Sequence, residues 1–167
     1  MKTSNWIFLV FTTFFLSNNA LGLDAVITDS AWDGKKVPDG QQCQRFGGNG
    51  STPTIRASDI PAGTQAVILA FTDRSVQKMN NGGHGKIGML VEEDSTEVEI
   101  PSVPGHSFEL PDDVFLVSAQ RNPSWDKAGA YMPPCSGGRG NNYVVMVQAV
   151  TIKNLEKKKF QRSTKST

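Results

Sequence analysis

The sequence has few of the residues that build several common kinds of site. Its 167 residues include only two cysteines, Cys43 and Cys135, which excludes a zinc site of four thiolates and a small scaffold held by many disulfides. Its 17 basic and 16 acidic residues nearly cancel, which argues against nucleic-acid binding through a general basic surface. Sixteen glycines and nine prolines disfavour a helical bundle, and the length suits one domain.

Histidine is equally scarce, and this limits the chemistry that the chain can perform. The two histidines are His84 and His106. A hydrolase built from Asp73, His84 and a serine stays as a weak alternative, because the Gly-x-Ser-x-Gly sequence of a nucleophile elbow is missing. The spacing of the histidines and carboxylates matches no metal-binding motif. We therefore expect no covalent catalysis, no metal site and no cofactor.

The N-terminal residues are typical of an export signal. Lys2 precedes an apolar run of about 11 residues, from Trp6 to Leu16, and small residues then follow up to Gly22. A membrane span needs roughly 20 apolar residues, so a transmembrane anchor is the weaker interpretation. The pattern predicts a secretory signal peptide over residues 1–22, cleavage after Gly22, and a secreted or periplasmic protein.

The charge is distributed unevenly along the rest of the chain. Without Lys2, the 16 remaining basic residues balance the 16 acidic ones. Residues 153–167 hold six basic residues against Glu156, so this tail carries about +5 and residues 23–152 carry about −5. We expect one domain over residues 23–152 and a disordered basic tail over residues 153–167. The tail is either simply solvated or a contact for an anionic surface.

Short apolar segments separated by glycine and proline predict an all-β protein. Residues 66–71 form a continuous apolar run, which is typical of a strand buried on both faces. Residues 24–62 are rich in turn residues, and we expect loops there. The fold class expected is a mainly antiparallel β-sandwich with long loops and little helix. Further strands are expected at residues 86–91, 97–100, 114–117 and 143–150.

Two polar loops, residues 72–85 and 131–142, hold most of the informative side chains. If both project from one end of the sandwich, they build one pocket. The glycine-rich sequence from Gly137 to Asn142 offers unshielded backbone N–H groups, which can form a concave anion site, and Arg139 adds a guanidinium that suits phosphate or carboxylate. The alternative is that this sequence is only a turn before the last strand.

The order and spacing of several short motifs resemble the phosphatidylethanolamine-binding protein family, which includes Raf kinase inhibitor-like proteins, and most of all its compact bacterial-type branch. The resemblance covers residues 25–150. The motifs that carry it are Trp32, Asp33-Gly34, Val37-Pro38, Cys43, Gly48 to Pro53, Ile60 to Thr64, Val67 to Phe71, Asp73, His84, Tyr131, Pro134-Cys135, Gly137-Gly138 and Tyr143.

The resemblance implies a sandwich with a small pocket for phosphate-like anions or phospholipid headgroups. In that pocket His84 donates to an anionic oxygen, and Asp73 orients the His84 ring or accepts from an ammonium group. The sequence departs from the family at Arg74 to Gln77, where a second acid and two prolines are lost, and at Asn141 and Asn142, which replace a His and an Arg. The ligand-binding residues implied are Asp73, His84, Tyr131, Pro134, Gly137, Gly138, Arg139 and Asn141.

The family pattern also places Cys43 and Cys135 in loops near the pocket end. Because an exported protein meets an oxidising environment, we expect a Cys43–Cys135 disulfide; the alternative is two buried free thiols. Two functions stay open. The first is an exported binding protein for a small anion or headgroup. The second is an inhibitor or modulator that acts by protein–protein contacts on a kinase, a protease or a cell-envelope partner.

Overall fold

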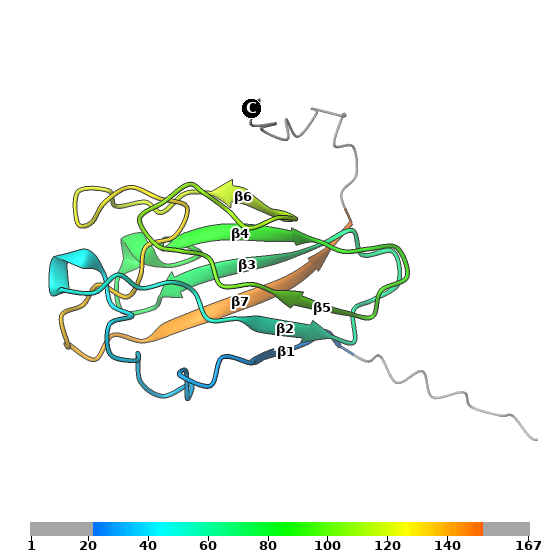
Figure 1. Cartoon of the computed structure of the whole chain (residues 1–167), viewed down its shortest axis with the longest axis horizontal. Helices are drawn as coiled ribbons and strands as arrows, with labels where there is room; N and C mark the ends of the chain where they lie inside the picture. Colours follow the sequence, from blue (N-terminus) through cyan, green and yellow to red (C-terminus); the bar gives the residue numbers. More distant parts are fainter. Residues whose placement is uncertain (1–21, 152–167) are drawn as a thin grey trace, which may run out of the picture.

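The computed structural model describes residues 22–151, and it is an all-β protein (Figure 1). The expected basic tail, and all of the expected signal peptide except Gly22, lie outside the described residues. No helix of the described part is long and apolar enough to cross a membrane. The elements are β1 (Asp24–Ile27), η1 (Gln44–Phe46), β2 (Ile55–Ser58), β3 (Ala66–Asp73), η2 (Gln77–Met79), β4 (Gly85–Leu90), β5 (Glu97–Ile100), β6 (Val114–Ser118) and β7 (Tyr143–Val150).

The strands form two antiparallel sheets that share one core. One sheet has the order β1-β2-β5 and the other the order β6-β4-β3-β7. Alternate residues of a strand face the same side, so Val67, Leu69 and Phe71 of β3 point together into the core. There they meet apolar side chains of the smaller sheet, such as Ile55 and Ile100. Burying both sheets against each other explains why the chain folds as a sandwich.

Five of the seven strands lie where the sequence predicts them. The run at residues 66–71 belongs to β3, seven of whose eight residues are buried, as expected for a central strand. Residues 24–62 were expected to be rich in loops, and no strand was predicted there, but β1 and β2 form within this stretch. Both strands are only four residues long. β1 is exposed throughout, and β2 alternates between buried and more exposed residues over too short a stretch to stand out among the turn residues around it. Antiparallel pairing with its neighbours stabilises each of them.

The polar loops that follow β3 and precede β7 meet at one end of the sandwich, drawn at the left in Figure 1. The N–H of Met132 donates to the carbonyl of His84 over 2.8 Å, and the N–H of Arg74 donates to the carbonyl of Asn142 over 2.8 Å. The chain segment with η1 lies at the same end. The antiparallel pairing of β3 with β7 is the cause, since it places the end of β3 beside the start of β7.

Candidate functional site

A pocket of about 970 Å³ opens at this end of the sandwich. The segment before β2 forms one wall, the ends of β3 and β7 form another, and residues 131–142 close the inner end. Six of the eight ligand-binding residues implied by the family resemblance line this pocket: His84, Tyr131, Pro134, Gly137, Gly138 and Asn141.

His84 is a buried polar residue of the lining, as is Thr72. His84 is 3% exposed, and its Nδ1 lies 2.7 Å from the carbonyl oxygen of Met132. A carbonyl can only accept, so Nδ1 carries the proton and Nε2 of the neutral ring is an acceptor. Burial lowers the pKa of His84 below its ordinary value, which keeps the ring neutral at pH 7. The ring also packs edge-on against Tyr143, with centroids 5.4 Å apart.

Asp73 does not line the pocket, and it does not orient the His84 ring. Its carboxylate is 2% exposed at the end of β3 and faces the glycine-rich loop instead. One oxygen accepts from the N–H of Ser75 over 2.8 Å, and the other accepts from the side-chain amide of Asn141 over 2.7 Å. The orienting partner expected for His84 is therefore replaced by the Met132 carbonyl. Asn141 lines the pocket, and its side-chain amide bonds to Asp73, which lies outside the lining.

Two tyrosines complete the inner wall. Tyr131 is buried and packs edge-on against Phe71, with ring centroids 4.9 Å apart. Burial raises the pKa of the Tyr131 hydroxyl far above its ordinary value, so this group stays protonated. The Tyr143 hydroxyl accepts a hydrogen bond from the N–H of Cys135 over 3.1 Å. Tyr143 belongs to the family pattern but not to the ligand-binding residues that the resemblance implies, yet it lines the pocket.

The glycine-rich loop contributes backbone rather than charge. Gly137 and Gly138 both have positive φ, at 62° and 80°, a backbone conformation that residues other than glycine rarely adopt. A Cβ added at Gly137 would collide with the ring of Phe46, so the absence of a side chain there leaves room for the opposite wall. Arg139 is exposed and lies outside the residues that line the pocket.

The cations of the pocket come from a segment that the sequence reasoning did not use for binding. Lys35 and Lys36 are exposed residues of the lining. Asp33 fixes their backbone, because its carboxylate accepts from the N–H groups of both lysines at 2.9 Å or less. These backbone bonds, that to Lys36 first, lower the pKa of Asp33. The sequence Asp33-Gly34-Lys35-Lys36 was the available signal, since an Asp followed by Gly is typical of a tight turn.

Much of the remaining surface of the pocket is apolar and lies along the edges of the two sheets, although Asp39, Gln42, Thr72, Ser136 and Asn142 also belong to the lining. The apolar part is formed by the edge strands β1 and β7 together with Ile55 of β2. β1 and β7 are outer strands of their sheets, so the sandwich is open between them. The pocket thus has polar groups at one end, an apolar flank, and a rim where the exposed Lys35 and Lys36 outnumber the exposed Asp39. The apolar lining residues of the strands are Ala25, Val26, Ile27, Ile55, Val144, Val145 and Val147.

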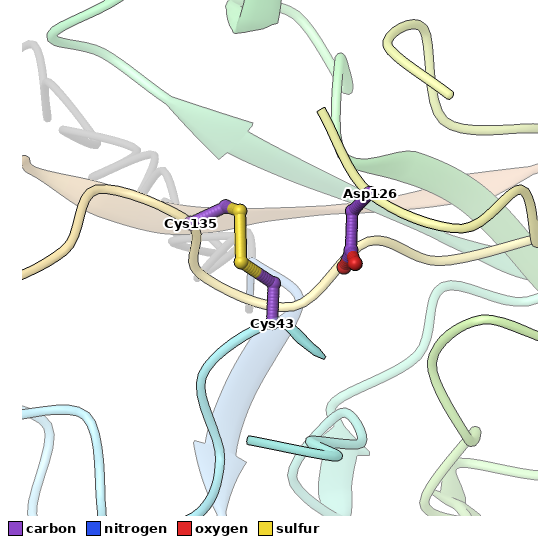
Figure 2. A group of neighbouring side chains, drawn as sticks. All are labelled: Cys43, Asp126 and Cys135. Atoms are coloured by element: carbon purple, nitrogen blue, oxygen red, sulfur yellow. A yellow bond between two sulfur atoms is a disulfide. The ribbon is translucent and has the colours of Figure 1, made fainter. Parts of the chain in front are cut away.

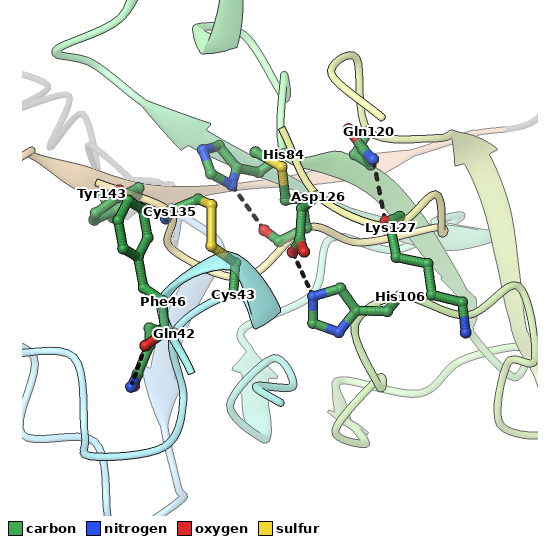
Figure 3. The surroundings of a disulfide bond; sticks show 11 residues. Gln42, Cys43, Phe46, His84, His106, Gln120, Asp126, Lys127, Cys135 and Tyr143 are labelled. Carbon is green, nitrogen blue, oxygen red and sulfur yellow. Dashed lines mark hydrogen bonds and ion pairs between the residues drawn. A yellow bond between two sulfur atoms is a disulfide. The ribbon is translucent and has the colours of Figure 1, made fainter. Parts of the chain in front are cut away.

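The expected disulfide is confirmed and joins the two loop walls of the pocket (Figure 3). Cys43 and Cys135 lie 92 residues apart in the chain with a Cα–Cα distance of 5.2 Å. Cys43 lies just before η1, in the same loop segment as Lys35 and Lys36. The N–H of Cys43 donates to the carbonyl of Pro134 over 3.0 Å. Cross-linking the loops limits how far the two walls can separate.

Comparisons with protein-family models, with curated proteins and with solved structures found no match for this chain. The chemistry of the pocket is therefore argued from its own geometry.

Proposed function

We propose that the protein is an exported binding module with a phosphatidylethanolamine-binding-protein-like fold. Its pocket takes a phosphate-like anion or a phospholipid headgroup and performs no covalent chemistry. The observation that carries this proposal is the convergence of His84, Tyr143 and the glycine-rich loop at the inner end of one pocket, beside Lys35 and Lys36. Polar groups gathered in a largely apolar pocket are the usual pattern of a small-molecule site.

The pocket offers complementary contacts to such an anion. Lys35 and Lys36 supply positive charge at the rim, and the loop at Gly137 and Gly138 offers backbone N–H groups without side-chain shielding. His84 accepts a hydrogen bond from a protonated phosphate oxygen when the ring is neutral. When the ring gains a proton, it donates to an anionic oxygen instead.

The hydrogen bonds of the site also support binding rather than hydrolysis. A catalytic triad needs a carboxylate that orients the histidine. Here the Nδ1 of His84 is bonded to the Met132 carbonyl, and both oxygens of Asp73 are engaged by Ser75 and Asn141. The hydroxyl of Ser75 accepts from the N–H of Asn142 and is part of the same loop network.

Export is supported by the Cys43–Cys135 disulfide, because such bonds persist in oxidising compartments.

Titration calorimetry with inorganic phosphate and with phosphorylethanolamine tests the proposal. Wild-type protein should release or absorb heat with one saturable site, and His84→Ala should weaken binding roughly tenfold or more through the lost hydrogen bond to a charged group. His84→Gln, which keeps a polar side chain of similar reach, serves as the matched variant. The absence of binding at millimolar ligand would contradict the anion pocket and leave the protein–protein modulator as the function to pursue.

A further inference from the structure

A second group of polar side chains lies beside the disulfide and outside the pocket lining (Figure 2). The sulfur atoms of Cys43 and Cys135 and a carboxylate oxygen of Asp126 all lie within 4.8 Å of one another. All three residues are buried, so water competes little for these atoms. Asp126 comes from the loop between β6 and β7, and Cys43 comes from the segment before β2. The cluster therefore exists only in the folded chain.

His106 extends this cluster. Its Nε2 is hydrogen-bonded to Oδ2 of Asp126, and both side chains are 2% exposed (Figure 3). The other ring nitrogen of His106, Nδ1, is buried and has no hydrogen-bond partner among the described residues. A buried pair of ionisable groups is costly, and an apolar pair of the same size is often as stable. The cluster thus calls for an explanation other than stability.

We propose that reduction of the Cys43–Cys135 bond turns this cluster into a binding site for Zn²⁺. The two thiolates and one carboxylate oxygen of Asp126 are the protein ligands. His106 is a positioning residue that holds the Asp126 carboxylate through Oδ2, as hydrogen-bonding partners commonly do for metal ligands. The disulfide form has no free thiolate, so the bond and the metal site exclude each other. The proposal does not depend on the function proposed for the pocket.

The geometry requires only small movements. Zinc bonds of about 2.3 Å to sulfur and about 2.0–2.2 Å to oxygen place tetrahedral ligands roughly 3.5–3.8 Å apart. The two sulfur atoms reach that spacing once their bond opens, and the carboxylate approaches by about 1 Å. The backbone holds both cysteines without the disulfide, because the N–H of Cys43 donates to Pro134 and the N–H of Cys135 donates to Tyr143. Thiolate ligands favour Zn²⁺ over Mg²⁺ or Ca²⁺.

The chemical balance is simple. A water-soluble phosphine reduces the disulfide with two electrons: its phosphorus takes the oxygen of one water molecule and becomes the phosphine oxide, and the two sulfur atoms take the two protons. The metal then displaces one proton from each thiol and binds both thiolates, with two protons released to solvent.

Cobalt provides the spectroscopic test, because Co²⁺ occupies tetrahedral zinc sites and absorbs visible light. The protein is reduced with the phosphine, freed of reductant under anaerobic conditions and titrated with Co²⁺. We expect sulfur-to-cobalt charge-transfer and tetrahedral ligand-field bands that saturate at one equivalent and disappear when Zn²⁺ is added. Protein that was never reduced should show none of these bands. Reduced protein without them overturns the proposal.

Substitutions at Asp126 and His106 measure what each of these residues adds to metal affinity beyond the two thiolates. Asp126→Asn should weaken Co²⁺ binding to the reduced protein by more than tenfold, and His106→Ala by about 10–100-fold. His106→Gln, which keeps a donor for Asp126, should retain more affinity than His106→Ala. Asp112→Asn, at an exposed aspartate of the described chain, is the matched control and should bind like wild type. Near-UV circular dichroism verifies folding. Equal affinity in wild type and in folded Asp126→Asn would contradict the three-ligand site.

Discussion

The side-chain amide of Asn141 donates to a carboxylate oxygen of Asp73 over 2.7 Å, and this bond joins two residues that lie 68 positions apart in the chain. It connects the end of β3 to the loop that precedes β7. The family pattern has a histidine where Asn141 stands, so the residue that departs from the pattern has a structural partner of its own. Asp73 is thereby held outside the pocket lining.

Removal of the Asn141 amide should destabilise the protein. Asn141→Ala leaves one oxygen of a carboxylate that is 2% exposed without its partner, which costs about 1–3 kcal/mol in the free energy of unfolding. Urea denaturation measures the change. Asn142→Ala is the matched control, because the described hydrogen bonds of Asn142 use its backbone, and its stability should stay within about 0.5 kcal/mol of wild type. Equal stability of both variants would contradict a structural role for the Asn141–Asp73 bond.

The two rim lysines should strengthen anion binding through their charge. Lys35→Gln and Lys36→Gln should each weaken phosphate binding by about 1.5- to 5-fold, the range typical of exposed charge pairs, and the effect should shrink as salt is added. Calorimetry at two salt concentrations measures both quantities. Lys127→Gln, at an exposed lysine outside the pocket lining, should leave the affinity unchanged. An equal loss in all three variants would show that total charge, and not the rim, matters.

Anion affinity should rise as the pH falls. Burial lowers the pKa of His84, so the ring is neutral at pH 7 and gains a positive charge only in more acidic solution. Sulfate is a suitable probe because its own charge stays constant between about pH 5 and 8, the range in which histidines titrate. Wild-type protein should bind sulfate more tightly at the acidic end, and His84→Gln should lose this dependence. A flat profile in wild type would contradict a contact between a protonated His84 and the anion in this pH range.

The same lowered pKa makes stability depend on pH. The unfolded chain takes up a proton at His84 near its ordinary pKa of 6.5, whereas the folded protein resists protonation until lower pH. The contribution of His84 is therefore fully present above pH 6.5 and is lost as the pH falls toward the folded pKa, by at most about 1.4 kcal/mol per pH unit. Denaturation of wild type and His84→Gln across this range measures the difference. Parallel curves would mean that the pKa is not lowered by folding.

The disulfide should contribute much of the stability. Closing a loop of 92 residues restricts the unfolded chain, and the chain-entropy relation gives about 4–5 kcal/mol for this length. The double variant Cys43→Ala, Cys135→Ala should lose stability of that order in urea denaturation. Reduced wild-type protein, which keeps both sulfur atoms and their packing, separates the cross-link from the loss of volume. A double variant as stable as wild type would contradict this role.

Much of the fold could be predicted from local patterns, and the exceptions have physical reasons. β3 and β7 carry long apolar runs that only a sandwich core can bury, so their positions followed from composition. β1 lacks such a run, and its pairing with β2 alone makes it a strand. The residues of the pocket, like the strands, could be predicted from the sequence only in part. The family resemblance implied His84 and Tyr131 as ligand-binding residues, and both line the pocket, whereas Lys35 and Lys36 were missed because nothing local shows that their turn faces the pocket.

The sequence by itself determined the strand-rich class and the loops that hold polar residues, because both depend on residue type and order; it offered a Cys43–Cys135 bond or two free thiols, and the structure decided for the bond. The tertiary structure alone decided which partner each polar group has. The resemblance implied that Asp73 orients the His84 ring or accepts from an ammonium group, yet Asp73 bonds to Asn141 and His84 to the Met132 carbonyl. The tertiary structure also placed Asp126 beside the disulfide and His106 against Asp126. Hydrogen bonds act over about 3 Å, and only the packing of distant segments sets distances on that scale.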